Sequence, residues 1–168
     1  MRLFIAAPLS DDAKRELRKA QEAIRSQGVC GTYTGTQNLH LTLAFIGEYQ
    51  DPSKVLAAMR KVPFEPFDVS LTRLGSFGDL WWCGLDCPDA LYSYVNALKS
   101  ALRDEDIPFD VKKFRPHVTL LRRSDRGFTV PAVGRAGTII DRVLLMRSDR
   151  TSSGMIYTAV GSVAATAK

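Results

Sequence analysis

Both histidines of this 168-residue chain stand in the same short unit, His-x-Thr-Leu, first at His40 and again at His117. Successive side chains of an extended strand point to opposite faces, so this spacing places Thr42 beside His40 and Thr119 beside His117. A neutral imidazole exchanges a proton near neutral pH, and a threonine hydroxyl donates a hydrogen bond. Two such pairs facing one cleft would offer four groups suited to a reaction at phosphorus.

One His-x-Thr unit alone would fit an ordinary amphipathic strand, with its histidine on the surface or satisfied in the core. Here the whole histidine complement falls into two matching units, so we expect both to serve one shared site. Strict alternation also predicts an apolar back for the first strand, formed by Leu39, Leu41, Leu43 and Phe45.

The charge of the chain agrees with an anionic partner. The net charge is +5 and the sequence pI is 9.3, which favours nucleic acid or phosphorylated small molecules. A basic cluster flanks His117, whereas a cluster elsewhere would be read as a solvated face. Its members are Lys112, Lys113, Arg115, Arg122, Arg123 and Arg126.

The composition is that of an ordinary globular protein. Hydrophobic residues make up 45% and charged residues 24%, and the length suits one domain that needs neither disulfides nor metal. Three cysteines without a secretory signal predict reduced intracellular thiols. Cys83 and Cys87 lack a second ligand pair, so no zinc site is expected. The apolar opening is short and is followed by Asp11 and Asp12, which predicts a first strand and no membrane span.

Apolar periodicity and turn residues predict the elements that must position the two units. Besides the two motif strands, strands are expected at 3–7, 67–74, 80–85, 138–147 and 155–164. Helices are expected at 11–26, 52–60 and 88–104, and turns or loops at 31–37, 75–79, 124–131 and 148–154. This order suggests two α+β halves related by pseudo-repetition, each with one motif, in a single two-lobed domain over residues 1–168.

The paired units, in the contexts 38–48 and 115–122, resemble the two-histidine (2H) phosphoesterase superfamily. Within it they are similar to the bacterial and archaeal RNA 2′,3′-cyclic phosphodiesterases, formerly called 2′-5′ RNA ligases. Segments 2–6, 74–77 and 148–157 also match that family's layout. Family members often carry Arg-Trp shortly before the first unit, where this chain has 33–36, Tyr-Thr-Gly-Thr.

The resemblance implies a bilobal, pseudo-symmetric α+β fold with two antiparallel sheets facing a central cleft and helices outside. It implies hydrolysis of RNA 2′,3′-cyclic phosphate ends to 2′-phosphomonoesters, with no metal or nucleotide cofactor. By analogy, His40 would donate a proton to the leaving 3′ oxygen and His117 would accept one from water. Thr42 and Thr119 would bind the non-bridging phosphate oxygens.

The phosphate-binding arginine remains open between two neighbours. Family matching points to Arg122, whereas strict alternation puts Arg123 on the face of His117. A bulge, or a strand that ends at Leu121, would bring Arg122 round to that face. We choose Arg122.

Further substrate contacts are expected from aromatic and basic residues. Phe45, Phe77 and Tyr157 could stack on a base, and Trp81 and Trp82 could do so too, although at least one of these two is expected in the core. Lys112 and Lys113 are candidates for phosphates upstream of the RNA end, with binding that weakens as salt rises.

The expected partner is RNA with a 2′,3′-cyclic phosphate end or a cyclic nucleotide, bound by a cytoplasmic monomer without a membrane. Two alternatives remain. The same acid and base would also catalyse the reverse reaction, 2′-5′ ligation, and a non-catalytic nucleotide- or RNA-binding module would keep the cleft without turnover.

Overall fold

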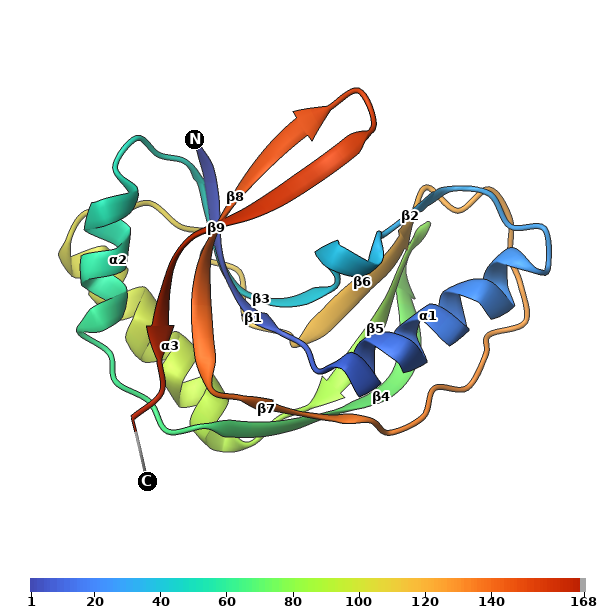
Figure 1. Cartoon of the computed structure of the whole chain (residues 1–168), viewed down its shortest axis with the longest axis horizontal. Helices are drawn as coiled ribbons and strands as arrows, with labels where there is room; N and C mark the ends of the chain where they lie inside the picture. Colours follow the sequence, from blue (N-terminus) through green and yellow to red (C-terminus); the bar gives the residue numbers. More distant parts are fainter. Residues whose placement is uncertain (167–168) are drawn as a thin grey trace.

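The computed structural model describes residues 1–166, which form two antiparallel sheets and three α-helices (Figure 1). The expected α+β fold is confirmed. The helices are α1 (Asp11–Arg25), α2 (Pro52–Arg60) and α3 (Asp89–Asp104), with a 3-10 turn at Thr36–Asn38. The strands are β1 (Arg2–Pro8), β2 (Thr32–Tyr33), β3 (His40–Glu48), β4 (Phe67–Phe77), β5 (Leu80–Asp86), β6 (His117–Arg122), β7 (Gly137–Ile140), β8 (Arg142–Thr151) and β9 (Gly154–Ala164).

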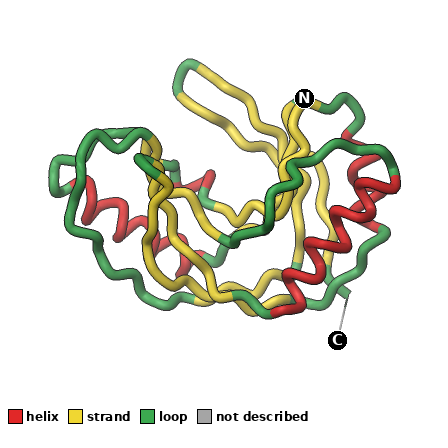
Figure 2. Tube along the Cα trace, turned by 180° about the vertical axis from the view of Figure 1, so that it is seen from behind, coloured by secondary structure: helices red, strands yellow, loops and turns green. Residues whose placement is uncertain are grey.

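The first sheet has the strand order β3-β1-β8-β9, and the second has the order β2-β6-β5-β4-β7. Helices α2 and α3 contact the first sheet, and α1 contacts the second. Figures 1 and 2 show these helices at opposite ends of the molecule, so each sheet with its helices forms one lobe. The two motif strands, β3 and β6, belong to different sheets and contact each other.

The lobes are not the two sequence halves that the element order suggested. The first sheet combines β1 and β3 with the C-terminal strands β8 and β9, and α1 covers the second sheet although it comes early in the chain. The cause is pairing: β1 lies between β3 and β8, so the end of the chain must return to the sheet that contains its beginning.

Two predicted boundaries near the C-terminus are wrong. The single strand expected over 138–147 is two strands, β7 and β8, which lie in different sheets and are separated only by Asp141. The polar turn expected over 148–154 is a hairpin with its turn at 152–153, since β8 and β9 stay paired as far as Thr151 and Gly154. In Figure 1 this hairpin extends beyond the rest of the first sheet. Most of its polar residues therefore belong to paired strands and not to a turn.

The hairpin of β4 and β5 differs in the same way. The turn expected over 75–79 is shorter, because Phe77 already pairs with Leu80. Gly78 makes this tight turn at φ 61°, a conformation that glycine adopts without steric cost. The two strands therefore stay paired as far as Phe77 and Leu80.

Local signals explain the first helix well. Its expected range, 11–26, agrees with the observed α1, and the Ser10 hydroxyl accepts a hydrogen bond from the Ala13 amide at 3.1 Å as an N-cap. Leu17 and Ile24 are fully buried on its inner side. Helix α1 is thereby fixed against the second sheet.

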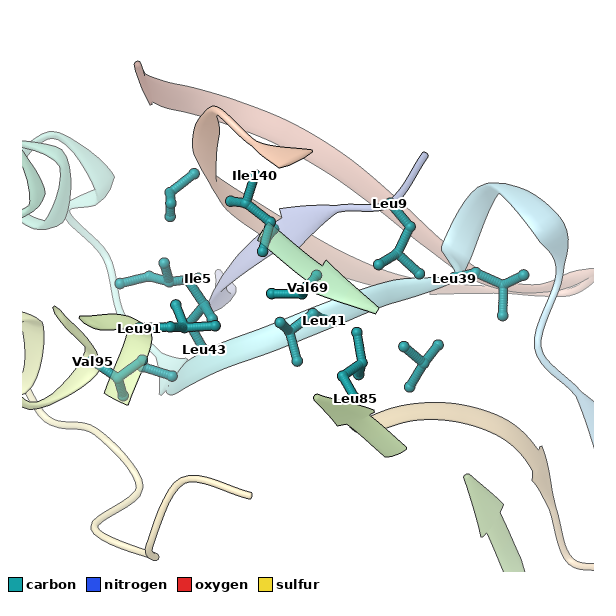
Figure 3. Packing of buried hydrophobic residues seen from close by; sticks show 14 of the residues in the cluster. Ile5, Leu9, Leu39, Leu41, Leu43, Val69, Leu85, Leu91, Val95 and Ile140 are labelled. Atoms are coloured by element: carbon teal, nitrogen blue, oxygen red, sulfur yellow. The ribbon is translucent and has the colours of Figure 1, made fainter. Parts of the chain in front are cut away.

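One hydrophobic cluster joins the two lobes. Figure 3 shows Leu41 and Leu43 of β3 between Leu91 of α3 and residues of the second sheet, including Val69 and Leu85. Such burial contributes about 25 cal/mol per Å² of apolar surface. The shared core holds the two motif strands in a fixed relation.

Three further expectations concern cysteines, tryptophans and the membrane. Cys30, Cys83 and Cys87 are free thiols. Trp81 packs against the core and Phe128, at a ring distance of 4.5 Å, whereas neither Trp81 nor Trp82 is fully buried. Among residues 1–166 there is no helix with the length and apolar character needed to cross a membrane.

Candidate active site

A β-bulge in each motif strand decides which side chains share a face with the histidine. In β3, Thr42 pairs with Ala6 and Ala44 pairs with Ile5, which leaves Leu43 as an extra residue. The same happens in β6, where Thr119 pairs with Trp82 and Leu121 pairs with Trp81, leaving Leu120. Each bulge comes three residues after its histidine. A bulge reverses the alternation beyond it.

The bulges bring the fifth residue after each histidine onto the histidine's face. In β3 this residue is Phe45, which is 51% exposed, and in β6 it is Arg122, which is exposed. The expectation that Phe45 belongs to the apolar back is therefore wrong, because Leu43 and Ala44 are both buried behind the strand. We call the face with the histidine the front face of each sheet.

Arg123 is the first residue after β6. Its backbone has φ 57°, and its guanidinium donates a hydrogen bond to the Thr32 hydroxyl at 3.0 Å. Of the two arginines that the sequence left open, the bulge in β6 puts Arg122 on the same strand face as His117 and Thr119.

The two imidazoles are oriented in the same way. In each, Nδ1–H donates to the carbonyl two residues earlier, at 2.6 Å: Asn38 for His40 and Arg115 for His117. A carbonyl only accepts, so Nδ1 carries a proton in both rings, and Nε2 is left to exchange one. Nε2 of His40 lies 2.7 Å from the Thr42 hydroxyl, as the His-x-Thr spacing predicts.

The charges of the second lobe reach His40. Burial lowers the pKa of the His40 imidazole below its usual value, and the positive charges of Arg122 and His117 lower it further. The hydrogen bond to the Asn38 carbonyl acts in the opposite direction. Because Arg122 and His117 belong to the other sheet, their effect means that the two front faces share one electrostatic environment.

Aromatic rings surround each histidine. On the first sheet, the ring of Phe4 lies 5.0 Å from His40, 5.1 Å from Tyr157 and 6.2 Å from Phe45. The edge-on contact between His40 and Tyr157 is 5.4 Å. Rings at these distances restrict the imidazole and leave Phe45 free to meet a ligand.

On the second sheet, Phe77 and Trp82 lie 6.0 and 6.2 Å from the His117 ring and 5.3 Å from each other. Phe77 is 51% exposed. The indole of Trp82 lies flat against Gly75 of the neighbouring strand, where a Cβ would overlap the ring. The sequence analysis did not identify Phe4 as a site residue, because Phe4 stands within an apolar run. It also did not link Gly75 to Trp82. A glycine inside a strand is the sequence signal for such a close contact.

Two predicted substrate contacts lie elsewhere. Lys112 and Lys113 are in the loop between α3 and β6, where they line a hollow beside α3 and not the front faces. Within residues 1–166, no group of three or more His, Cys, Asp or Glu side chains is arranged to hold a metal ion.

Comparisons with known proteins find similar phosphoesterases. The family model described as "LigT like Phosphoesterase" matches residues 7–80, which include the first His-x-Thr unit. An RNA 2′,3′-cyclic phosphodiesterase of Thermotoga maritima is 28% identical over 175 residues, covering 94% of this chain and 91% of the relative. A protein of the same name from Escherichia coli is 29% identical over 138 residues, covering 79% of this chain and 78% of the relative.

Solved structures support the fold. The ligand-free crystal structure of Escherichia coli LigT has a TM-score of 0.87 at 24% identity, and covers 99% of this chain and 98% of that chain. The bilobal arrangement of two sheets is therefore shared along the whole length.

Proposed function

We propose that this chain, which belongs to the LigT-like phosphoesterase family, hydrolyses RNA 2′,3′-cyclic phosphate ends to 2′-phosphomonoesters. The observation that supports the proposal is that His40 and His117 stand on β3 and β6, two strands that contact each other. The two histidines come from different sheets, are oriented by equivalent carbonyl contacts and share one electrostatic environment. A matched proton donor and acceptor is what a hydrolase needs and a simple binding module does not.

The reaction needs an acid and a base on opposite sides of phosphorus. We assign Nε2 of His117 to take the proton of the attacking water, whose oxygen forms the new bond to phosphorus. The bond from phosphorus to the 3′ oxygen breaks, and Nε2 of His40 protonates that oxygen. The product keeps its phosphate on the 2′ oxygen, and each well-placed imidazole contributes about 10²–10⁴-fold in rate.

The remaining front-face groups would bind the phosphate. The hydroxyls of Thr42 and Thr119 would donate to its non-bridging oxygens, and Arg122 would add a charge-assisted hydrogen bond as negative charge builds up. In the free protein Thr42 bonds to Nε2 of His40, so the substrate must take over this contact.

The lowered pKa of His40 bears on its role as acid. Burial, Arg122 and His117 favour the neutral imidazole in the free protein, whereas a proton donor must start protonated. A bound cyclic phosphate brings a negative charge next to the ring and raises its pKa again. Substrate binding and protonation of His40 are therefore expected to be coupled.

The decisive test uses a nucleoside 2′,3′-cyclic phosphate with excess EDTA, because the proposed acid and base need no metal. We expect the 2′-phosphate as product, and loss of turnover in both His40→Ala and His117→Ala, with folding of each variant checked by circular dichroism. A 3′-phosphate product, or turnover that EDTA abolishes, would overturn the mechanism. Binding without turnover would favour the non-catalytic module.

The remaining expectations stay predictions: the monomeric state, the cytoplasmic location and the single domain. The hydrophobic cluster that joins both lobes supports one domain. The last two residues of the expected range 1–168 lie outside the described residues. In water, hydrolysis should dominate over the reverse ligation.

A further inference from the structure

A hollow of about 330 Å³ lies between α3 and the loop that leads to β6. On the helix side it is lined by Lys99 and Arg103, and on the loop side by Lys112 and Lys113. Lys99 and Arg103 lie on one stripe of α3, because residues four apart share a helix face. The volume is within the range of ligand sites for small molecules.

The four cations lack acidic partners. Within residues 1–166 none of them forms an ion pair, and the nearby carboxylate of Asp110 accepts the backbone amide of Lys112 at 2.9 Å. The ammonium of Lys99 donates to the Lys112 carbonyl at 2.9 Å, which fixes the loop against the helix. Like charges held together in this way repel each other, and a bound anion would relieve that repulsion.

The hollow also has aromatic walls. Phe109 and Phe114 line it, and the guanidinium of Arg103 stacks over the ring of Phe109 at 5.3 Å. Val111, at the rim, is 80% exposed. Cations next to aromatic and apolar surface are the combination that holds single-stranded nucleic acid, whose phosphates are charged and whose bases stack.

The loop connects this hollow to both halves of the active site. In the middle of the loop, the Asp110 amide donates to the Phe45 carbonyl of β3 at 2.9 Å. At its end, the Arg115 carbonyl holds Nδ1 of His117 at 2.6 Å. Four extended residues span at most about 14 Å, so Lys113 lies within a few nucleotides of His117.

We propose that this hollow binds the single-stranded body of the RNA substrate, a few nucleotides upstream of the cyclic phosphate, through Lys99, Arg103, Lys112 and Lys113. The inference rests on the proposed function, since it names how the same active site selects RNA over a lone cyclic nucleotide. The sequence predicted phosphate contacts at Lys112 and Lys113. The structure adds two cations of α3, Lys99 and Arg103, to the same hollow.

The expected effect follows from counterion release. For single strands, the logarithm of the binding constant changes with the logarithm of salt by about −0.7 per phosphate contact. Removing two contacts flattens the slope by about 1.4 and weakens binding about 25-fold at 0.1 M salt. A lone nucleoside cyclic phosphate has no upstream phosphates and gains nothing from the hollow.

The test compares cytidine 2′,3′-cyclic phosphate with an RNA hexanucleotide that ends in the same group. In the double variant Lys99→Gln, Arg103→Gln, the ratio of kcat/KM for the hexanucleotide to kcat/KM for the nucleoside should fall about 25-fold at 0.1 M salt. The matched control is Lys14→Gln, Arg18→Gln, which removes two cations from α1 on the other lobe and should preserve the ratio. An unchanged ratio in the first variant, or equal falls in both, overturns the inference.

A binding measurement separates this inference from the proposed function. Fluorescence anisotropy with a hexanucleotide ending in a 3′-phosphate needs no turnover, so it tests the hollow even if neither substrate is hydrolysed. Weaker binding by the α3 variant, and not by the control, supports the hollow. If both bind the hexanucleotide equally and the α3 variant loses only affinity for adenosine 5′-monophosphate, the occupant is a free nucleotide and the inference is wrong.

Discussion

Gln21 of α1 holds the bulge that brings Arg122 to the front face, and its replacement by leucine is a sharp test. Gln21 is only 6% exposed, and its side-chain amide donates to the carbonyls of Thr34 at 2.9 Å and Leu120 at 3.0 Å. Leu120 is the extra residue of the bulge, and its carbonyl also accepts the Thr34 amide at 2.9 Å. The buried Gln21 side chain thus ties both α1 and the segment at Thr34 to the bulge in β6.

The magnitude follows from these contacts. Each lost hydrogen bond costs about 1 kcal/mol, and the Thr34 carbonyl, left without this donor, adds about 1–3 kcal/mol. Gln21→Leu should therefore lower the free energy of unfolding by about 3–5 kcal/mol, which lowers Tm by about 6–20 °C for a chain of this size. A loosened Arg122 weakens a charge-assisted contact, so kcat/KM should fall about tenfold.

The assay is thermal unfolding followed by circular dichroism, with kcat/KM for a cyclic nucleotide measured well below both melting temperatures. Gln27→Leu is the control, because Gln27 lies on an exposed part of the same chain segment and bonds to the Ala23 and Thr129 carbonyls, away from β6. It should keep kcat/KM near the parent value. If Gln21→Leu loses stability but matches the control in kcat/KM, the bulge does not depend on Gln21 as argued.

Three further changes test single features of the site. Arg122→Ala should raise the pKa of His40, because a nearby positive charge disfavours the imidazolium; proton NMR titration of the two histidines measures it, and an unchanged or lower pKa contradicts the shared environment. Gly75→Ala should displace Trp82 and destabilise the fold by about 1–3 kcal/mol, measured by urea unfolding, and full stability would show that the indole has room to move. Thr119→Val should lower kcat about 10²-fold while Thr119→Ser restores most of it, and equal losses in both would argue against a hydroxyl donor.

The sequence predicted the chemistry of the site better than its local geometry. His-x-Thr spacing is enough to place each hydroxyl beside its ring, because it depends only on strand alternation over two residues. The bulges depend on which residue of the neighbouring strand each residue pairs with, so alternation alone could not show them. Their trace in the sequence is a pair of adjacent apolar residues, Leu43-Ala44 and Leu120-Leu121, both buried in the fold.

The sequence could not predict which lobe each strand joins, for a related reason. The break at Asp141 sends two consecutive strands into different sheets, and no local propensity reports which sheet a strand will join. Helix α1 was predicted well, since Ser10 and the apolar spacing of the helix are local signals.

The central claim is that His40 and His117 act together on one phosphorus atom, and a double-mutant cycle on kcat tests it most directly. Groups that act as one unit are strongly non-additive: once one is lost, losing the other costs little more. We expect His40→Ala, His117→Ala and the double variant to lose similar factors in kcat for a nucleoside 2′,3′-cyclic phosphate. If the two single losses multiply in the double variant, the histidines act independently and the proposed site is wrong.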